Sequence, residues 1–357
     1  MSDVILFDLL AFAAAFLASA VFTPAARDLA LRVRLIDYPG PRKVHVAPMP
    51  LLGGLAVYLA AVFAVAVFVT DEEWSQMVGL FVASTLVLVV GTLDDRGMLH
   101  HQIKLMLVMP FVAIILIGTD MHSEMFHLVT AVPGAGLPGV WIDYALSFVW
   151  FIGIIAAFSI LDHMDGLCAG VAAIVFAFSC SFAAVGGQLL VGTLAAAVLG
   201  ATLGFLRWNV QPARIFLGDG GAMLLGLVAA TLGIKLRFPE LSPTVSWMVP
   251  VLVLIVPIFD TTLVTVSRLR RGLVPFASPG KDHTAHRLVA LGMSQGRAVG
   301  VLYGIGVLGG VLAWVVALVG APAGILVVAS AVVTVVAALV WLERAPYQRQ
   351  RVETGSS

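Results

Sequence analysis

The chain has 357 residues, of which 61% are hydrophobic and only 11% are charged, and its formal net charge at pH 7 is zero. Soluble domains carry about 25% charged residues, so this composition excludes an ordinary soluble protein and indicates a polytopic membrane protein. A balanced charge also excludes a generally basic protein that coats nucleic acid, and we expect no nucleic-acid partner.

Long apolar runs recur along the whole chain and predict about eleven helical spans. Their approximate limits are 4–22, 51–69, 78–92, 103–118, 144–160, 168–184, 189–206, 220–236, 247–267, 297–318 and 323–342. We therefore expect an all-α fold with about 10–11 transmembrane helices, in which residues 1–357 form one integral-membrane domain. The first span has no basic segment before it, so we expect a retained helix rather than a cleaved signal peptide.

Basic residues are distributed unevenly among the predicted loops. One set of loops holds Arg27, Arg32, Arg34, Arg42, Lys43, Arg96, Lys104, Arg207, Arg214, Arg268, Arg270, Arg271, Lys281, Arg287, Arg297, Arg344, Arg349 and Arg351. The opposite set holds only Lys235 and Arg237. Positively charged loops stay on the cytoplasmic side, so we expect the N-terminus outside, the C-terminus inside and the motifs below on the cytoplasmic face.

Aspartates lie at the ends of several apolar spans, namely Asp94, Asp95, Asp162, Asp165 and Asp219. A carboxylate at a helix centre costs roughly 2.5–3.5 kcal/mol, so acids beside apolar runs are candidate functional groups. Acids that converge need a cation to stay ionised together, and Mg²⁺ prefers oxygen ligands. The plainer interpretations are a solvated helix end for 94–95 and a polar loop for 162–165. We predict a Mg²⁺-dependent site, with Mn²⁺ as the alternative ion.

Asp219 stands in the sequence Gly218-Asp219-Gly220-Gly221, directly before the span that starts near residue 220. Its side chain could simply cap that helix. The flanking glycines also allow close backbone approach, and a helix N-terminus favours a phosphate group. A metal or phosphate site is therefore the sharper hypothesis for this segment.

A second group of polar residues combines histidine with basic side chains in the loop 268–296. His283 and His286 are spaced as HxxH, beside Lys281 and Arg287. This pair alone is weak evidence for zinc, because a zinc site needs at least a third ligand. The loop either is solvated or supplies cationic and hydrogen-bonding contacts to a diphosphate.

Basic residues near the N-terminus form a comparable candidate. Arg42, Lys43 and His45 lie among several prolines, and Lys104 begins the fourth span. Each could anchor the chain at anionic lipid head groups. Alternatively, these four residues contact substrate phosphates.

Glycines at i, i+4 spacing occur in the tenth span as Gly300-x-x-x-Gly304 and Gly306-x-x-x-Gly310. Such spacing favours close helix packing in membranes. It suggests helix contacts within the chain or a homodimer.

Five motifs, in this order along the chain, carry a resemblance to a known family. They are Asp37 to His45 (DYPGPRKVH), Leu93-Asp94-Asp95 with Lys104, Leu161 to Leu167 (LDHMDGL), Asn209 to Asp219 (NVQPARIFLGD) and Asp282 to Leu288 (DHTAHRL). Together they resemble the polyprenyl-phosphate N-acetylhexosamine-1-phosphate transferases (glycosyltransferase family 4). That family includes the undecaprenyl-phosphate GlcNAc-1-phosphate transferases and the phospho-MurNAc-pentapeptide transferases.

The resemblance implies roles for the acids. Asp219 would ligate Mg²⁺, with Asp95 as a further ligand. Asp94 and Asp95 would handle the lipid phosphate, as base or as metal neighbours, and Asp162 would belong to the same catalytic group.

The resemblance also implies the substrate contacts. Asp165, Asn209 and Phe216 would hold the uridine, Phe216 by stacking, while His283 and His286 would contact the diphosphate. Arg42, Lys43, His45 and Lys104 would complete the set of substrate-binding residues.

The chain departs from the family pattern at two places. Ala156 and Ser159 stand where the family has asparagines before the aspartate pair, and the histidine loop is HxxH rather than HxHH. The first departure affects an asparagine contact to metal or substrate, for which Ser159 would substitute weakly.

The resemblance therefore implies an enzyme of the bacterial plasma membrane that transfers a sugar-1-phosphate from a UDP-N-acetylhexosamine to polyprenyl phosphate and releases UMP. The segment Arg42-Lys43-x-His45 favours UDP-GlcNAc over the MurNAc-pentapeptide substrate. Two other classes stay open: an intramembrane prenyltransferase, which also uses aspartates to hold Mg-diphosphate, and a transporter, for which Asp260 in the ninth span is the best support.

Overall fold

The computed structural model describes residues 2–39, 47–68, 74–98, 107–122, 136–275 and 280–345. These residues are almost entirely helical, with one short antiparallel pair of strands, β1 (Ile36–Asp37) and β2 (Met49–Pro50). The helices are α1 (Ser2–Arg32), α2 (Gly53–Phe68), α3 (Trp74–Asp95), α5 (Met109–Gly118), α7 (Gly136–Leu161), α8 (Leu167–Val185), α9 (Leu189–Asn209), α10 (Gly218–Lys235), α11 (Pro243–Ser246), α12 (Met248–Val253), α13 (Ile255–Arg270), α14 (Thr284–Ala290), α15 (Gln295–Val319) and α16 (Ala321–Arg344).

The helix lengths confirm a polytopic membrane protein. Within the described residues, seven helices are long and apolar enough to cross a membrane, and α2 and α5 are shorter apolar helices. Every predicted span overlaps a helix, but several boundaries differ. The first helix continues through Pro24 to Arg32, and the ninth predicted span is broken at Leu254 into α12 and α13.

Helix α10 lies at the centre of the bundle. It packs against α2, α3, α7 and α8, and all of its residues are buried except Asp219 and Lys235. A helix that is apolar all round is suited to such a position. The first turn of α10, which carries Asp219, is therefore held by the surrounding helices.

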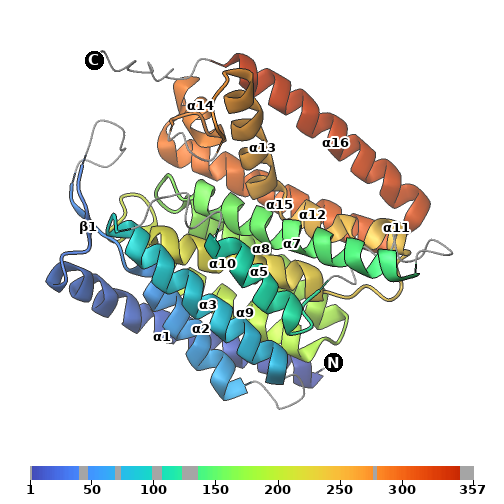
Figure 1. Ribbon diagram of the computed structural model, residues 1–357, viewed down its shortest axis with the longest axis horizontal. Helices are drawn as coiled ribbons and strands as arrows, with labels where there is room; N and C mark the ends of the chain where they lie inside the picture. The colour runs from blue at the N-terminus through green and yellow to red at the C-terminus, as the bar shows by residue number, and fades with distance from the viewer. Residues whose placement is uncertain are drawn as a thin grey trace.

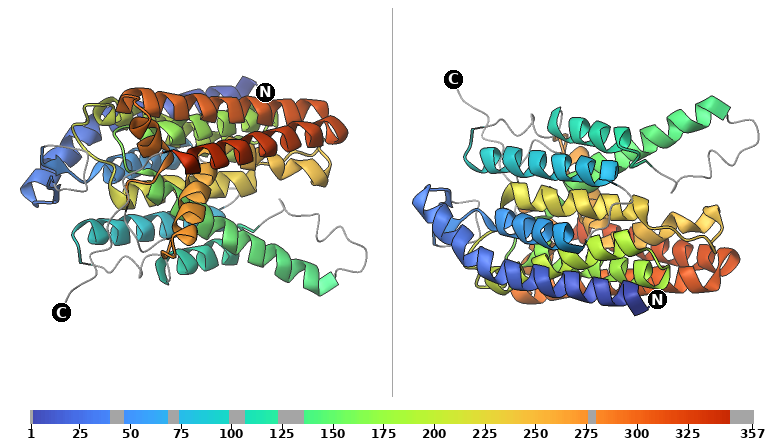
Figure 2. Two further views of the ribbon diagram at one scale, coloured as in Figure 1. Left: turned by 90° about the horizontal axis from the view of Figure 1, so that it is seen from above. Right: turned by 90° about the horizontal axis from the view of Figure 1, so that it is seen from below.

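Two further groups of helices lie on either side of this centre (Figure 1). Helices α1, α2, α3 and α9 lie together below it in this view, and α13, α14, α15 and α16 lie above it. The long helices run roughly alongside one another, whereas α13 crosses them steeply (Figure 2). The break at Leu254 gives α13 this direction, and it places Asp260 in the interior with 1% of its surface exposed.

The glycine motifs of α15 have different surroundings. A Cβ atom on Gly310 would collide with the ring of Phe178, and one on Gly306 would touch Ile174. Close packing is thus confirmed for the second motif, and it occurs within the chain. Added Cβ atoms on Gly300 and Gly304 would meet nothing within 4 Å, and the homodimer stays a prediction.

Candidate active site

The first turn of α10 is pressed against the backbone of two other helices. A Cβ atom on Gly54 would collide with the backbone of Gly221, and one on Gly91 would collide with the backbone of Gly220. Gly218 has φ +77°, a conformation that favours glycine. The sequence Gly-Asp-Gly-Gly is therefore explained by backbone contact with α2 and α3, and this contact fixes the position of Asp219.

The cap of α10 comes from α3. Both carboxylate oxygens of Asp95 accept the backbone N–H of Asp219, each at 3.1 Å. Asp219 itself makes no side-chain cap, because it lies inside the first turn of the helix. Of the two hypotheses for Asp219, the N-cap is therefore wrong, and a carboxylate at the end of a distant helix takes that role.

Two further acids, Asp162 and Asp165, lie near Asp219 in the segment between α7 and α8. Ser159 donates a long hydrogen bond of 3.4 Å to Oδ1 of Asp219, which links the end of α7 to the start of α10. Burial, and next the negative charges of Asp219 and Asp165, raise the pKa of Asp162 to about 7. Asp94 precedes Asp95 at the end of α3 and is half-buried. The structure thus brings together the acids of three separate motifs.

Asp165 and Asn209 tie two loops together. Oδ2 of Asp165 accepts the backbone N–H of Ala213 at 3.0 Å. The amide of Asn209 accepts the N–H of Gly166 at 3.1 Å and donates to the carbonyl of Ile215 at 3.0 Å. Asn209 is buried and organises the loops, so a direct contact with uridine stays a prediction.

Phe216 is half-buried, and its backbone joins the same loop to the start of α2. Its N–H donates to the carbonyl of Pro50 at 2.9 Å, and its carbonyl accepts the N–H of Gly53 at 3.0 Å. Stacking of the Phe216 ring on a base is not tested by these contacts.

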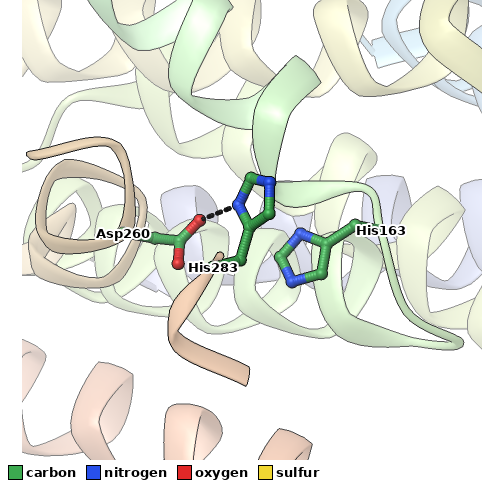
Figure 3. A group of neighbouring side chains, drawn as sticks. All are labelled: His163, Asp260 and His283. Carbon is green, nitrogen blue, oxygen red and sulfur yellow. Dashed lines mark hydrogen bonds and ion pairs between the residues drawn. The ribbon is translucent and has the colours of Figure 1, made fainter. Parts of the chain in front are cut away.

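Three histidines are gathered beside a buried carboxylate. The ring of His163 stacks on His283 with centroids 4.1 Å apart and on His286 with centroids 4.7 Å apart. Nδ1 of His283 lies 2.9 Å from Oδ2 of Asp260, and Oδ1 of Asp260 accepts the backbone N–H of Thr284 at 2.7 Å. Figure 3 shows Asp260 on one side of the His283 ring and His163 on the other.

His163, Asp260 and His283 offer three ligand atoms within 4.8 Å of one another, but their geometry does not suit one metal ion. The lone pairs of an imidazole lie in the plane of its ring. The rings of His163 and His283 are stacked with only 28° between their planes, so their lone pairs point along nearly parallel planes and do not converge. Nδ1 of His283 is also already paired with Asp260.

A buried ionic network holds the histidine loop in place. Asp282 pairs with Arg268 at 2.8 Å and with Arg271 at 2.5 Å. Burial acts to raise the pKa of Asp282, but the hydrogen bonds and charge of Arg268 outweigh it and lower that pKa to about 2. Arg287 is fully buried and pairs with Glu343 at 2.9 Å. These contacts attach the loop to the ends of α13 and α16.

Four predicted substrate-binding residues lie outside the described residues, namely Arg42, Lys43, His45 and Lys104. Their roles stay predictions.

Comparison with known proteins identifies the family. The model of glycosyl transferase family 4 matches residues 77–237. The chain is 33% identical over 296 residues to a probable undecaprenyl-phosphate N-acetylglucosaminyl 1-phosphate transferase of Bacillus subtilis, covering 83% of this chain and 81% of the relative. The chain belongs to glycosyl transferase family 4.

Other relatives extend this finding. A decaprenyl-phosphate N-acetylglucosaminephosphotransferase of Mycolicibacterium smegmatis is 32% identical, with 78% of this chain and 74% of the relative covered. The undecaprenyl-phosphate alpha-N-acetylglucosaminyl 1-phosphate transferase of Escherichia coli K12 is 26% identical, with 79% of this chain and 77% of the relative covered. The family match contains Asp94 through Asp219 and ends before α13, so Asp260 and the histidine loop lie beyond it.

Sequence reasoning missed several residues of this glycosyl transferase family 4 site. His163 sits inside the quoted LDHMDGL motif, but nothing in the sequence indicated that its ring would stack on the loop 120 residues later. Asp260 had a usable signal, an acid within an apolar run. Tyr303, whose hydroxyl donates to the carbonyl of Gly166 at 2.6 Å, had none.

The raised pKa of Asp162 predicts how stability depends on pH in the absence of divalent ions. The unfolded carboxyl has a pKa near 4 and the folded one about 7. Between these values the native protein binds more protons than the unfolded chain does. Its free energy of unfolding should therefore fall as pH rises from about 4 to 7 and then level off. In EDTA, thermal unfolding should show this slope, and Asp162→Asn should flatten it. An unchanged slope in the variant would contradict the assignment.

Proposed function

We propose that the protein transfers GlcNAc-1-phosphate from UDP-GlcNAc to polyprenyl phosphate, of the undecaprenyl type, and releases UMP. The convergence of Asp95, Asp162 and Asp219 at one end of a buried helix carries this proposal. The printed names of the relatives support the same donor and acceptor classes. This step would begin the assembly of a cell-envelope polysaccharide.

The reaction is a phosphoryl transfer. An oxygen of the lipid phosphate attacks the β-phosphorus of UDP-GlcNAc, and the bond from that phosphorus to the bridging oxygen breaks. The new diphosphate links lipid and sugar, and UMP leaves with the bridging oxygen. An ionised lipid phosphate is already a nucleophile, so Asp94 or Asp95 needs only to orient it and keep it deprotonated.

The residues at the start of α10 fit a divalent cation. Burial, and next the negative charges of Asp219 and Asp165, raise the pKa of Asp162 to about 7, and such a group of carboxylates is stabilised by a cation. Their oxygen atoms suit Mg²⁺ or Mn²⁺ better than zinc. We propose Asp219 as the principal ligand with Asp95 and Asp162 beside it. A bound Mg²⁺ would neutralise charge on the diphosphate.

The nucleotide would lie over the two loops that Asn209 ties together. Asp165 and Phe216 are held there by backbone contacts to Ala213 and Pro50. His283 and His286 would contact the diphosphate from the opposite side. Asp162 would stand between these two groups.

A cleft between α7 and α13 suits the polyprenyl chain. Its volume is about 390 Å³, and its lining includes Trp150, Ala157, Ile258 and Thr265. Its mostly apolar wall can hold a hydrocarbon chain.

The distribution of basic residues supports a cytoplasmic active site in the bacterial plasma membrane, with the N-terminus outside. A UDP-sugar in the cytoplasm would then reach the acids directly. The lipid phosphate would approach along the membrane surface.

The direct test uses purified protein with Mg²⁺, undecaprenyl phosphate and UDP-GlcNAc labelled in the sugar. We expect label to enter the lipid phase, and we expect much weaker transfer from UDP-GalNAc and UDP-MurNAc-pentapeptide. Preferred transfer from the pentapeptide substrate would assign the phospho-MurNAc reaction instead. Transport of the label into vesicles without any labelled lipid would refute the transferase.

Tyr303→Phe should weaken nucleotide binding selectively. The change removes one hydrogen bond to the Gly166 carbonyl, which still accepts the N–H of Gly170. One such bond contributes about 1 kcal/mol, so KM for UDP-GlcNAc should rise about fivefold with little change in kcat. Trp314→Phe is the matched control, since it removes one bond from the same helix, α15, to Ser181 of α8. Equal effects of both changes on KM would contradict the assignment.

A further inference from the structure

We propose that Asp260 is a positioning residue that fixes the ring of His283, among three neighbouring imidazoles, with a proton on Nδ1 and with Nε2 facing the diphosphate. This inference rests on the proposed function. It assigns a role to an acid that lies beyond the family match, on the steeply inclined helix α13.

The first step of the argument is the surroundings of the Asp260 carboxylate. The side chain is 1% exposed, and its two oxygens each have one partner, Nδ1 of His283 and the backbone N–H of Thr284. A buried carboxylate depends on such partners. Asp260 therefore fixes both the ring of His283 and the start of α14.

The second step concerns the protons on His283. A carboxylate accepts hydrogen bonds, so Nδ1 of His283 carries a proton and cannot accept one. In the neutral ring Nε2 is then the acceptor, and in the cation it becomes a second donor. Figure 3 shows Nδ1 turned toward Asp260 and the other ring nitrogen turned away from it.

The third step compares the other two histidines. Nδ1 of His163 is 3.1 Å from the carbonyl of Ile160, and its buried Nε2 has no hydrogen-bond partner among the described residues. Nδ1 of His286 likewise has none there. Both rings lie within 5.6 Å of His283. Of the three histidines, His283 is the one whose Nδ1 is paired with the carboxylate of Asp260.

The charges around the group agree with this pairing. Burial, and next the charge of His283, lower the pKa of His286 to about 4, with Lys281 acting in the same direction. Asp282 is engaged by Arg268 and Arg271 rather than by a histidine ring.

The consequence for the reaction is a fixed position for Nε2 of His283, which donates to the diphosphate when the ring carries both protons. Negative charge develops on the phosphate of UMP as the bridging bond breaks. A preorganised N–H donor stabilises that charge more than the charge of the bound substrate. Asp260 therefore acts on kcat through His283 and touches no substrate itself.

A double-mutant cycle on UMP release tests this role, using Asp260→Asn, His283→Gln and the double variant. The asparagine can still accept the N–H of Thr284, but its NH₂ group faces Nδ1 of His283 and removes the charge. We expect Asp260→Asn to lower kcat about a hundredfold, with less than a threefold change in KM for UDP-GlcNAc. In the His283→Gln background, the same change should alter kcat by less than threefold. Equal losses in both backgrounds would overturn the proposal.

Two controls separate this role from folding. Asp143→Asn replaces another buried acid, near the opposite end of α7, and should leave kcat unchanged. Asp260→Glu keeps the charge and should be more active than Asp260→Asn, whereas the reverse order would show that shape alone matters. In ¹⁵N spectra of the wild type, a neutral His283 with its proton on Nε2 would contradict the proposal even if UDP-GlcNAc were not the substrate. Absence of UMP release by the wild type would refute only the proposed function.

Discussion

Asp219→Ala should lower UMP release from UDP-GlcNAc by about a thousandfold or more, while the protein stays folded. The backbone N–H of residue 219 would still donate to Asp95, so the cap of α10 is kept. The loss would fall on the site, because the principal metal ligand and its charge stabilisation of the diphosphate disappear. Turnover at saturating Mg²⁺ and thermal unfolding in EDTA measure the two effects separately.

The stability of the metal-free Asp219→Ala variant should also change in a defined direction. Removing the charge of Asp219 relieves Asp162, whose pKa it helps to raise, so the metal-free variant should be at least as stable as the wild type. Asp28→Asn, an exposed acid on α1, is the matched control and should change neither property. Near-normal turnover by Asp219→Ala would refute the metal assignment.

Gly54→Ala should disrupt the site through the backbone. The added Cβ would collide with backbone atoms of Gly221, which cannot move aside as a side chain can. We expect a loss of about 2–4 kcal/mol in stability, as for severe overpacking. UMP release should fall with it, because the first turn of α10 carries Asp219. Thermal unfolding in detergent and the UMP assay together measure both losses.

Gly118→Ala provides the comparison. A Cβ at Gly118, the last residue of α5, would meet nothing within 4 Å. This change should leave activity intact and either preserve or slightly increase stability. Equal effects of Gly54→Ala and Gly118→Ala on stability and activity would contradict the close-packing role of Gly54.

The spans and the acidic motifs could be predicted because they depend on local sequence. Hydropathy alone located the apolar helices, because each polar residue adds its own free-energy cost when it is placed in lipid. Positions where helices contact one another were not accessible in this way. Asp95 caps a helix that begins 123 residues later, and no local pattern in α3 records that partner.

The histidine group shows the same limit. His283 and His286 were predicted to contact the diphosphate from their basic surroundings and from the family resemblance, and that role stays a prediction. The stacking of His163 and the pairing of Asp260 depend on the break at Leu254 and on how α13 crosses the bundle. These are properties of tertiary packing, and the sequence contributed only the observation that an acid lay in an apolar run.

The identity of the released nucleotide tests the central claim most directly. Purified protein, Mg²⁺ and undecaprenyl phosphate are combined with UDP-GlcNAc that carries ³²P in the β-phosphate and ³H in the sugar. Sugar-1-phosphate transfer predicts that both labels enter the lipid in equal amounts, with one UMP released for each. Release of labelled UDP, with only the sugar label in the lipid, would contradict phosphoryl transfer at the Asp219 site.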